Sequence, residues 1–238
     1  MKKLLFTGAS GGVGRAIIPR LYALGYELIL HAHEGGEALR AYLQELSIHA
    51  PVIEADLTNS EEVRAFIAKV NTYGPVEILV NNAGVAHARA SWKLDVDEMT
   101  ALMERNFFSA VRCTQPLLEV MRLRGAGRII SISSVVAHQP SFGTSGYAAS
   151  KSALEGYMRG IAVDVANKGI TANTIAYGFM NAGMLREVPE EVLEQVKQRI
   201  PMGYFGDAEQ VAYLIHMLVE SPYTTGQTMH VNGGQWMP

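Results

Sequence analysis

The amino-acid sequence predicts a doubly wound α/β domain with a mostly parallel sheet of seven strands. Short apolar runs alternate with helical patterns along the whole chain, and a glycine-rich turn joins the first run to the first helical pattern. Regular strand–helix alternation implies right-handed crossovers, which leave helices on both faces of a parallel sheet. The sequence contains no repeat, low-complexity stretch or linker that would divide it. We therefore expect one domain over residues 1–238.

The strands and helices are expected in strict alternation, because each short apolar run is followed by apolar residues at helical spacing. The expected strands are residues 4–6, 27–31, 52–54, 78–81, 128–132, 171–176 and 228–231. The expected helices are residues 13–24, 37–45, 60–71, 96–124, 145–167, 190–199 and 208–219. Pro116 should kink or split the fourth helix because proline lacks the N–H donor. Gly169 should cap the fifth helix at its C-terminus.

Composition limits the classes of function. Hydrophobic residues make up 48% of the chain and charged residues 18%, as in an ordinary soluble globular protein. The net charge of −3 gives no argument for a nucleic-acid or anionic-membrane partner. No apolar run approaches the ~20 residues of a membrane span, and Lys2-Lys3 precedes too short an apolar run for a signal peptide. Cys113 is the single cysteine, so we expect no disulfide framework and a cytoplasmic location.

The glycine-rich turn, TGASGGVGR over residues 7–15, lies between the first strand and the first helix. Its glycines allow the backbone to turn tightly and approach a ligand, and the helix N-terminus offers free N–H groups to a pyrophosphate. The turn lacks the Gly-Lys-Ser/Thr ending of a nucleoside-triphosphate loop. Its position favours dinucleotide binding over a purely structural strand–helix turn.

The spacing Gly8-x-x-x-Gly12-x-Gly14 resembles the phosphate loop of the short-chain dehydrogenase/reductase family. Similar family motifs follow: the NNAG stretch over residues 81–84, Ser134 thirteen residues before Tyr147, and the tail over residues 225–234. The resemblance covers nearly the whole chain and implies a Rossmann domain. Within the family, the chain is most similar to the 3-oxoacyl-[acyl-carrier-protein] reductases, a subgroup that grades into sugar, polyol and steroid enzymes.

Tyr147 and Lys151 are candidate catalytic residues because side chains four apart lie on one helix face. A free tyrosine has a pKa of about 10, and a neighbouring ammonium lowers it towards the working range of an acid–base group. Ser134 can donate a hydrogen bond to a substrate oxygen. The resemblance further implies that Lys151 binds the nicotinamide ribose and that Asn106 holds a water in a proton relay.

The residues expected to bind the cofactor combine the glycine-rich turn, the ends of later strands and the catalytic pair. They are Gly8, Ser10, Gly11, Gly12, Val13, Gly14, His33, Asp56, Leu57, Asn82, Ala83, Gly84, Tyr147, Lys151, Gly178 and Phe179. Enzymes that use NAD commonly carry an acid at the end of the second strand, where this chain has Ala32 followed by His33. That favours NADPH, although Gly11 supplies no basic side chain, so NADH stays open.

Three functions remain open: a 3-oxoacyl thioester reductase, a dehydrogenase of another small alcohol, and a non-catalytic dinucleotide-binding scaffold. A small carbonyl or alcohol is the expected substrate. An acyl carrier protein could present it to a basic cluster formed by Arg122, Arg124, Arg128 and Lys168, although a solvated basic face is as good an interpretation. The histidines show no metal-ligand spacing, so no metal is expected. The resemblance to the family also implies a homotetramer, whose subunits are joined through the helices over residues 96–124 and 145–167 and through the last strand.

The chain departs from the family after the sixth strand. The family usually has Pro-Gly there, with a threonine four residues after the glycine that bonds the nicotinamide carboxamide. Here Tyr177 replaces the proline and Ala182 replaces the threonine. Losing one hydroxyl contact should weaken cofactor binding by on the order of 1 kcal/mol rather than abolish it. The segment over residues 184–200 is expected to cover the pocket but carries no readable specificity code.

Overall fold

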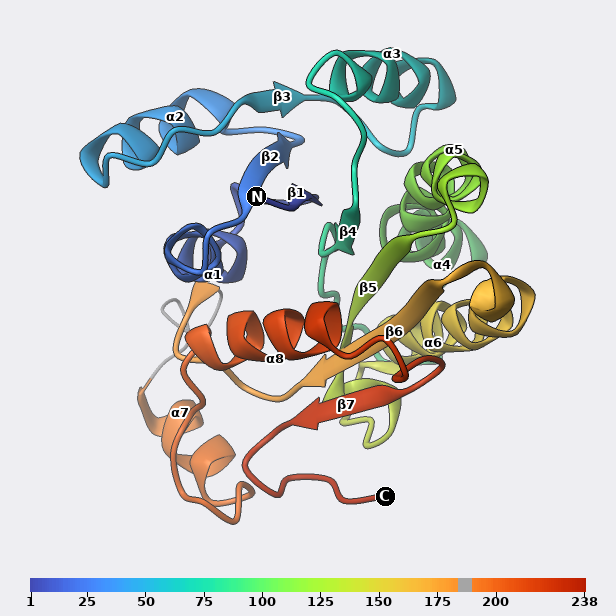
Figure 1. The fold of residues 1–238 in the computed structure, drawn as a ribbon. Helices are drawn as coiled ribbons and strands as arrows, with labels where there is room; N and C mark the ends of the chain where they lie inside the picture. The colour runs from blue at the N-terminus through green and yellow to red at the C-terminus, as the bar shows by residue number, and fades with distance from the viewer. Residues whose placement is uncertain (184–189) are drawn as a thin grey trace.

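The computed structural model describes residues 1–183 and 190–238, and its centre is one parallel sheet of seven strands (Figure 1). Strand order is β3-β2-β1-β4-β5-β6-β7, and every neighbouring pair is parallel. The strands are β1 (Lys3–Phe6), β2 (Glu27–Ala32), β3 (Val52–Glu54), β4 (Ile78–Asn81), β5 (Gly127–Ser134), β6 (Ile170–Tyr177) and β7 (Thr228–Val231). This confirms the predicted doubly wound sheet. Successive strands are added on one side of β1 as far as β3 and then on its other side from β4 onwards, and the crevice between β1 and β4 is where such folds bind ligands.

Two layers of helices cover the sheet. They are α1 (Gly12–Ala23), α2 (Gly36–Glu45), α3 (Ser60–Asn71), α4 (Val96–Met103), α5 (Ser109–Arg124), α6 (Ser145–Val165), α7 (Glu190–Lys197) and α8 (Glu209–Glu220). Apolar residues of α1, α2 and α8 pack in one core cluster, whereas those of α3, α5 and α6 pack in another (Figure 1). Within the described residues, no helix is both long enough and apolar enough to traverse a bilayer.

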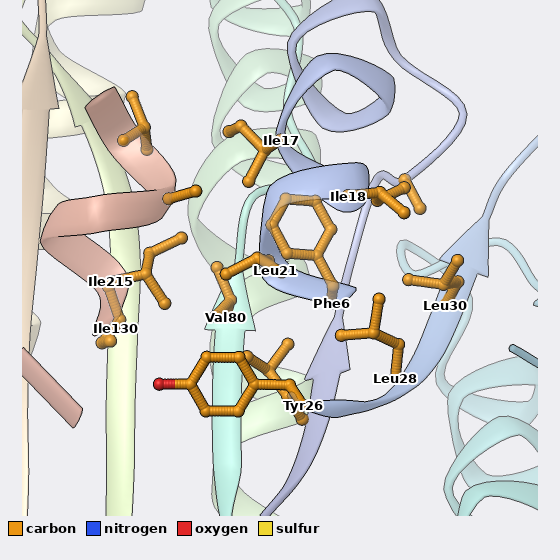
Figure 2. Packing of buried hydrophobic residues seen from close by; sticks show 14 of the residues in the cluster. Phe6, Ile17, Ile18, Leu21, Tyr26, Leu28, Leu30, Val80, Ile130 and Ile215 are labelled. Atoms are coloured by element: carbon orange, nitrogen blue, oxygen red, sulfur yellow. The ribbon is translucent and has the colours of Figure 1, made fainter. Parts of the chain in front are cut away.

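Side chains that alternate between the two faces of the sheet divide the hydrophobic core into two clusters. Phe6 on β1 faces the first cluster, where it lies close to Ile17 and Leu21 of α1 (Figure 2). Leu5, its neighbour in the chain, faces the second cluster. Because successive side chains of a strand point to opposite faces, a sheet covered on both sides needs continuous apolar runs. The short runs seen in the sequence meet this requirement.

The long helical pattern over residues 96–124 is interrupted, but not at Pro116 as predicted. A π-helical turn, Glu104–Phe108, separates α4 from α5, whereas Pro116 lies inside the continuous helix α5. Such turns insert a residue into the helix and are frequent at functional sites. The turn buries Asn106, which the sequence had marked as a candidate catalytic residue.

Helix α6 ends as predicted. A short 3₁₀ turn, Ala166–Lys168, follows it, and Gly169 then adopts a left-handed conformation with φ of 71°. This conformation costs an L side chain energy that glycine avoids, so Gly169 turns the chain back into β6. The parallel strands β5 and β6 therefore present their carboxyl ends beside the start of α6.

Candidate active site

The two residues predicted to be the catalytic pair, Tyr147 and Lys151, lie on α6, beside the carboxyl end of β5. Lys151 is only 4% exposed, and its Nζ donates a hydrogen bond of 2.8 Å to the carbonyl of Ile132. The same Nζ lies 5.9 Å from the centroid of the half-buried Tyr147 ring. The i, i+4 spacing thus places the ammonium beside the phenol, as predicted.

Burial acts on the two groups in opposite directions. It raises the pKa of the Tyr147 phenol, and a hydrogen bond with the Ser134 side chain lowers it in part. Burial lowers the pKa of Lys151 to about 8, while the carboxylate of Glu155 acts to raise it. The pKa of Tyr147, the group expected to transfer the proton, is therefore raised rather than lowered as predicted, while the pKa of Lys151 moves closer to neutral pH.

Ser134 and Asn106 complete the group. The Ser134 hydroxyl accepts the N–H of Val136 at 3.2 Å, which orients it at the end of β5. The Asn106 side chain accepts the N–H of Val85 at 2.7 Å and donates to the Val85 carbonyl at 2.9 Å. Since both bonds go to one backbone position, the amide plane of Asn106 is fixed.

Gly84 joins these residues spatially. A Cβ added to Gly84 would lie 3.0 Å from Asn106 Oδ1 and 3.3 Å from Lys151 Nζ. The NNAG stretch therefore approaches the catalytic group too closely for a side chain at this position. The structure brings together all four residues predicted to be catalytic.

The glycine-rich turn forms a cradle that only glycine fits. Gly8 has φ of +68°, and a Cβ there would lie 2.7 Å from the Cα of Ala83. A Cβ on Gly14 would lie 2.6 Å from the Gly8 carbonyl oxygen. Gly11 is the N-cap residue of α1, and no side chain caps this helix. Free N–H groups at a helix start behind a glycine turn fit the pyrophosphate of a dinucleotide.

Asn82 and Thr7 fasten this turn to the end of β4. The Asn82 amide donates to the carbonyls of Thr7 at 3.0 Å and Gly8 at 3.1 Å. The Thr7 hydroxyl accepts the N–H groups of Asn82 at 3.0 Å and Ala83 at 3.1 Å. The two motifs are thus one hydrogen-bonded unit across the β1–β4 switch point.

His31 is a residue that the sequence reasoning missed. It is 1% exposed at the end of β2, and its Nδ1 accepts the N–H of Gly8 at 3.1 Å. Its Nε2 donates to the carbonyl of Ala55 at 3.0 Å, which fixes the tautomer. Burial lowers the pKa of His31 to about 4, so the ring is neutral at neutral pH. The sequence did offer a signal for this role: His31 directly precedes Ala32 and His33, the residues expected to select the cofactor.

The end of β2 places the predicted ribose residues beside each other. Ala32 is fully buried, whereas the His33 side chain is 57% exposed, with Nδ1 3.6 Å from Asp56 Oδ1. Burial opposes ionisation of Asp56, but hydrogen bonds from Thr58 and the nearby His33 hold its pKa below the usual range. The Leu57 side chain is buried in the second core cluster, which leaves its backbone for a ligand.

Four further residues predicted to bind the cofactor, Ser10, Val13, Gly178 and Phe179, have contacts of their own. Val13 packs partly against the first core cluster, and the Ser10 carbonyl accepts the side chain of Arg15. The Gly178 N–H donates to the Val231 carbonyl at 2.8 Å, so Gly178 lies against the tail. The Phe179 ring lies 6.3 Å from that of Phe205, and Phe179 lines a hollow of about 320 Å³.

The positions that depart from the family are also described. Burial and the neighbouring Tyr147 phenol both raise the pKa of Tyr177 far above its ordinary value. Ala182 is 6% exposed and belongs to the first core cluster. Gly183 packs on the start of α1, where a Cβ on Gly12 would lie 2.2 Å from its Cα. Residues 184–189, the first part of the segment expected to cover the pocket, lie outside the described residues.

Comparison with known proteins defines the class. A family model described as short chain dehydrogenase matches residues 2–193, so the chain belongs to the short-chain dehydrogenase family and is an oxidoreductase of that family, as its motifs predicted.

Three similar proteins narrow the comparison. The chain is 34% identical to the 3-oxoacyl-[acyl-carrier-protein] reductase of Escherichia coli, over 99% of this chain and 98% of that protein. It is 36% identical to an acetoacetyl-CoA reductase of Rhizobium meliloti, over 98% and 97%. It is 32% identical to the 3-oxoacyl-[acyl-carrier-protein] reductase of Staphylococcus aureus, over 99% and 98%.

We predict that His31 makes stability sensitive to acid. Its pKa of about 4 in the folded protein lies below the ordinary 6.5, so the unfolded chain binds the proton first. The contribution is intact above the unfolded pKa and is lost as pH falls from about 6.5 to about 4. As the pH falls over this range, the free energy of unfolding should decrease less in His31→Gln than in wild type. The difference should be roughly 1–3 kcal/mol. Urea unfolding at several pH values measures this, with the exposed His49→Gln as control. Parallel curves for wild type and His31→Gln would contradict it.

Proposed function

We propose that this oxidoreductase reduces the carbonyl of a 3-oxoacyl thioester to a secondary alcohol, with NADPH as cofactor. The observation that carries the proposal is the convergence of Tyr147, Lys151, Ser134 and Asn106 beside the glycine cradle. A bound nicotinamide would supply the hydride that adds to the carbonyl carbon. The remaining task is protonation of the carbonyl oxygen, and that falls to side chains of this protein.

Each catalytic side chain has a distinct part in that protonation. The Ser134 hydroxyl donates a hydrogen bond to the substrate oxygen and holds it near Tyr147. The Tyr147 phenol gives the oxygen its proton, and the Lys151 ammonium stabilises the phenolate that remains. Asn106 holds a water from which the phenol regains a proton.

The names of the similar proteins support the substrate class. These proteins are named for 3-oxoacyl and acetoacetyl thioesters, which share a carbonyl at the third carbon. The alternative is another small alcohol or ketone, because the catalytic group fits any secondary alcohol. A non-catalytic scaffold fits less well, since a buried lysine next to a tyrosine costs stability that a scaffold has no reason to retain.

The basic cluster does not support docking of an acyl carrier protein at the active site, contrary to the sequence-based argument. Arg128 begins β5 after Gly127, and Arg122 and Arg124 end α5, so they lie at the amino end of β5, whereas Tyr147 lies at its carboxyl end. Arg128 also donates to the carbonyls of Val219, Gly127 and Gly169. A carrier protein stays a proposal that rests on the similar proteins alone.

Preference for NADPH rests on the end of β2. Ala32 brings no carboxylate to repel a 2′-phosphate, and the exposed His33 offers a ring N–H to it. NADH is the alternative, since Gly11 adds no cation and Asp56 lies beside His33.

We predict that Tyr147→Phe loses roughly 10²–10⁴-fold in kcat for acetoacetyl thioester reduction, because it removes the proton donor. NADPH binding, followed by fluorescence, should be unchanged, because the glycine cradle is untouched. Tyr157→Phe, which removes a hydroxyl from the same helix, is the matched control and should keep full activity. Wild-type turnover of sugars or cyclic ketones, but of no thioester, would refute the substrate class, and near wild-type kcat in Tyr147→Phe would refute the mechanism.

Cofactor choice gives a second prediction. Ala32→Asp should lower the ratio of kcat/KM for NADPH over NADH by about tenfold or more, because the carboxylate repels a 2′-phosphate and accepts the ribose 2′-hydroxyl. Ala32→Asn is the control of equal size without charge. A ratio that stays constant in Ala32→Asp would place cofactor selection elsewhere.

We also propose a homotetramer. Large apolar side chains remain exposed along the helices expected at an interface: Leu123 on α5 is 75% exposed and Val163 on α6 is 84% exposed. Exposed apolar surface of this kind is typical of association surfaces. Light scattering should give four times the chain mass, and Val163→Glu should reduce it because the charge would be buried at the interface. A monomer mass for wild type would exclude the assembly.

A further inference from the structure

Helix α6 carries a second buried ionisable side chain, which the proposed mechanism does not use. Glu155 lies one turn after Lys151 and two turns after Tyr147, on the same face of the helix. It is 3% exposed. Burying a carboxylate costs several kcal/mol unless donors or cations compensate, so its presence calls for an explanation.

Donors from several elements hold this carboxylate in place. The Ser133 hydroxyl on β5 donates to Oε1 at 2.5 Å, and His138 Nε2 lies 3.0 Å from the same oxygen. Arg159, one turn further along α6, places Nη1 3.9 Å from Oε2. Hydrogen-bond donors and a cation therefore surround the group and compensate for the burial of its oxygens.

The C-terminal tail fixes His138. The Trp236 ring stacks on the His138 ring at a centroid distance of 4.3 Å and an interplanar angle of 29°. His230 on β7 contacts both rings, at 4.8 Å from His138 and 4.5 Å from Trp236. Burial and the nearby His138 lower the pKa of His230, and Glu155 opposes this shift. The carboxylate is therefore held from β5, from α6 and, through His138, from β7 and the tail.

Lys151 has few other sources of compensation. Its ammonium donates a hydrogen bond to a neutral carbonyl, that of Ile132. Asn106 and Gly84, which approach it from the π-helical turn and the β4 loop, bring no charge. Tyr147 faces it on α6, and Tyr177 on β6 lies beyond that phenol. Burial alone would lower the pKa of Lys151 and favour the neutral amine, whereas the negative charge of Glu155 acts to raise that pKa.

We propose that Glu155 is a positioning residue whose fixed, buried carboxylate keeps Lys151 protonated and so preserves the positive charge beside Tyr147. Glu155 contacts His138 and Arg159 rather than Lys151 directly, so its charge acts on the buried ammonium from one turn away on the same helix face. The consequence for turnover rests on the proposed function. The carboxylate itself touches neither the cofactor nor the reacting atoms in this arrangement; it acts through the lysine.

The protonation of Lys151 can be measured without activity. Protein labelled with ¹³C at the lysine ε-carbon is titrated by NMR, and the Lys151 signal is assigned by its loss in Lys151→Met. The midpoint should be near 8 in wild type. It should fall by about 1 pH unit in Glu155→Gln, because the opposite charge is removed while the hydrogen-bond acceptor is retained. Asp164→Asn, which removes an exposed carboxylate from the same helix, should leave it unchanged.

Glu155→Asp separates charge from structure. If the carboxylate serves only to hold Ser133 and His138, the isosteric Gln should be the milder replacement. If its charge serves Lys151, Asp should keep the Lys151 midpoint closer to wild type than Gln does. Thermal unfolding establishes that each variant is folded, and the Asp variant alone still tests the charge if Gln does not fold. A midpoint that Glu155→Gln leaves unchanged overturns the inference.

Kinetics connect the charge to turnover. The alkaline fall of kcat/KM for acetoacetyl thioester reduction should move to lower pH in Glu155→Gln by the same amount as the NMR midpoint. A moved midpoint with an unmoved pH profile would keep the charge relation between Glu155 and Lys151, but would remove Lys151 from the catalytic step and overturn the proposed mechanism. The two failures are therefore distinguishable.

Discussion

The desolvation of Lys151 is the interaction on which the site depends. A buried ammonium is costly, and the fold offsets that cost with a strand carbonyl at 2.8 Å and with a carboxylate one turn away. The carbonyl requires α6 to lie against the carboxyl end of β5 in one register, whereas the carboxylate lies one turn along α6 itself. The buried face of α6 therefore holds a cation in a place where water would otherwise screen its proposed effect on the Tyr147 phenol.

At the end of the site formed by the glycine-rich turn, close contacts between backbone segments decide which residues fit. Gly8 and Gly14 allow the turn after β1 to approach the β4 loop and its own helix at distances that no Cβ would permit. Asn82, Thr7 and His31 then lock that turn with hydrogen bonds to backbone groups. The cofactor end is thus built from backbone and stabilised by side chains behind it, whereas the catalytic end is built from the side chains themselves.

The sequence predicted the fold and the positions of most site residues because both depend on local or short-range patterns. Short continuous apolar runs define the strands, and the spacing of Tyr147 and Lys151 defines a helix face. It failed where three-dimensional contacts decide. The interruption of the fourth helix follows from packing around Asn106 rather than from Pro116. The roles of His31 and Glu155 depend on partners 23 or 22 residues away, Gly8 and Ser133, which no periodicity reveals.

The same distinction explains the departure from the family after β6. The family threonine bonds the nicotinamide, yet Ala182 lies in the core cluster of α1 and α8, with Gly183 seated on the start of α1. A hydroxyl at position 182 would enter apolar surroundings in this arrangement and would lose hydrogen bonds to water. The alanine is therefore consistent with packing of the segment against α1. If the nicotinamide is bound more weakly for this reason, affinity for the cofactor depends mainly on the backbone cradle, and the proposed proton transfer by Tyr147 is unaffected.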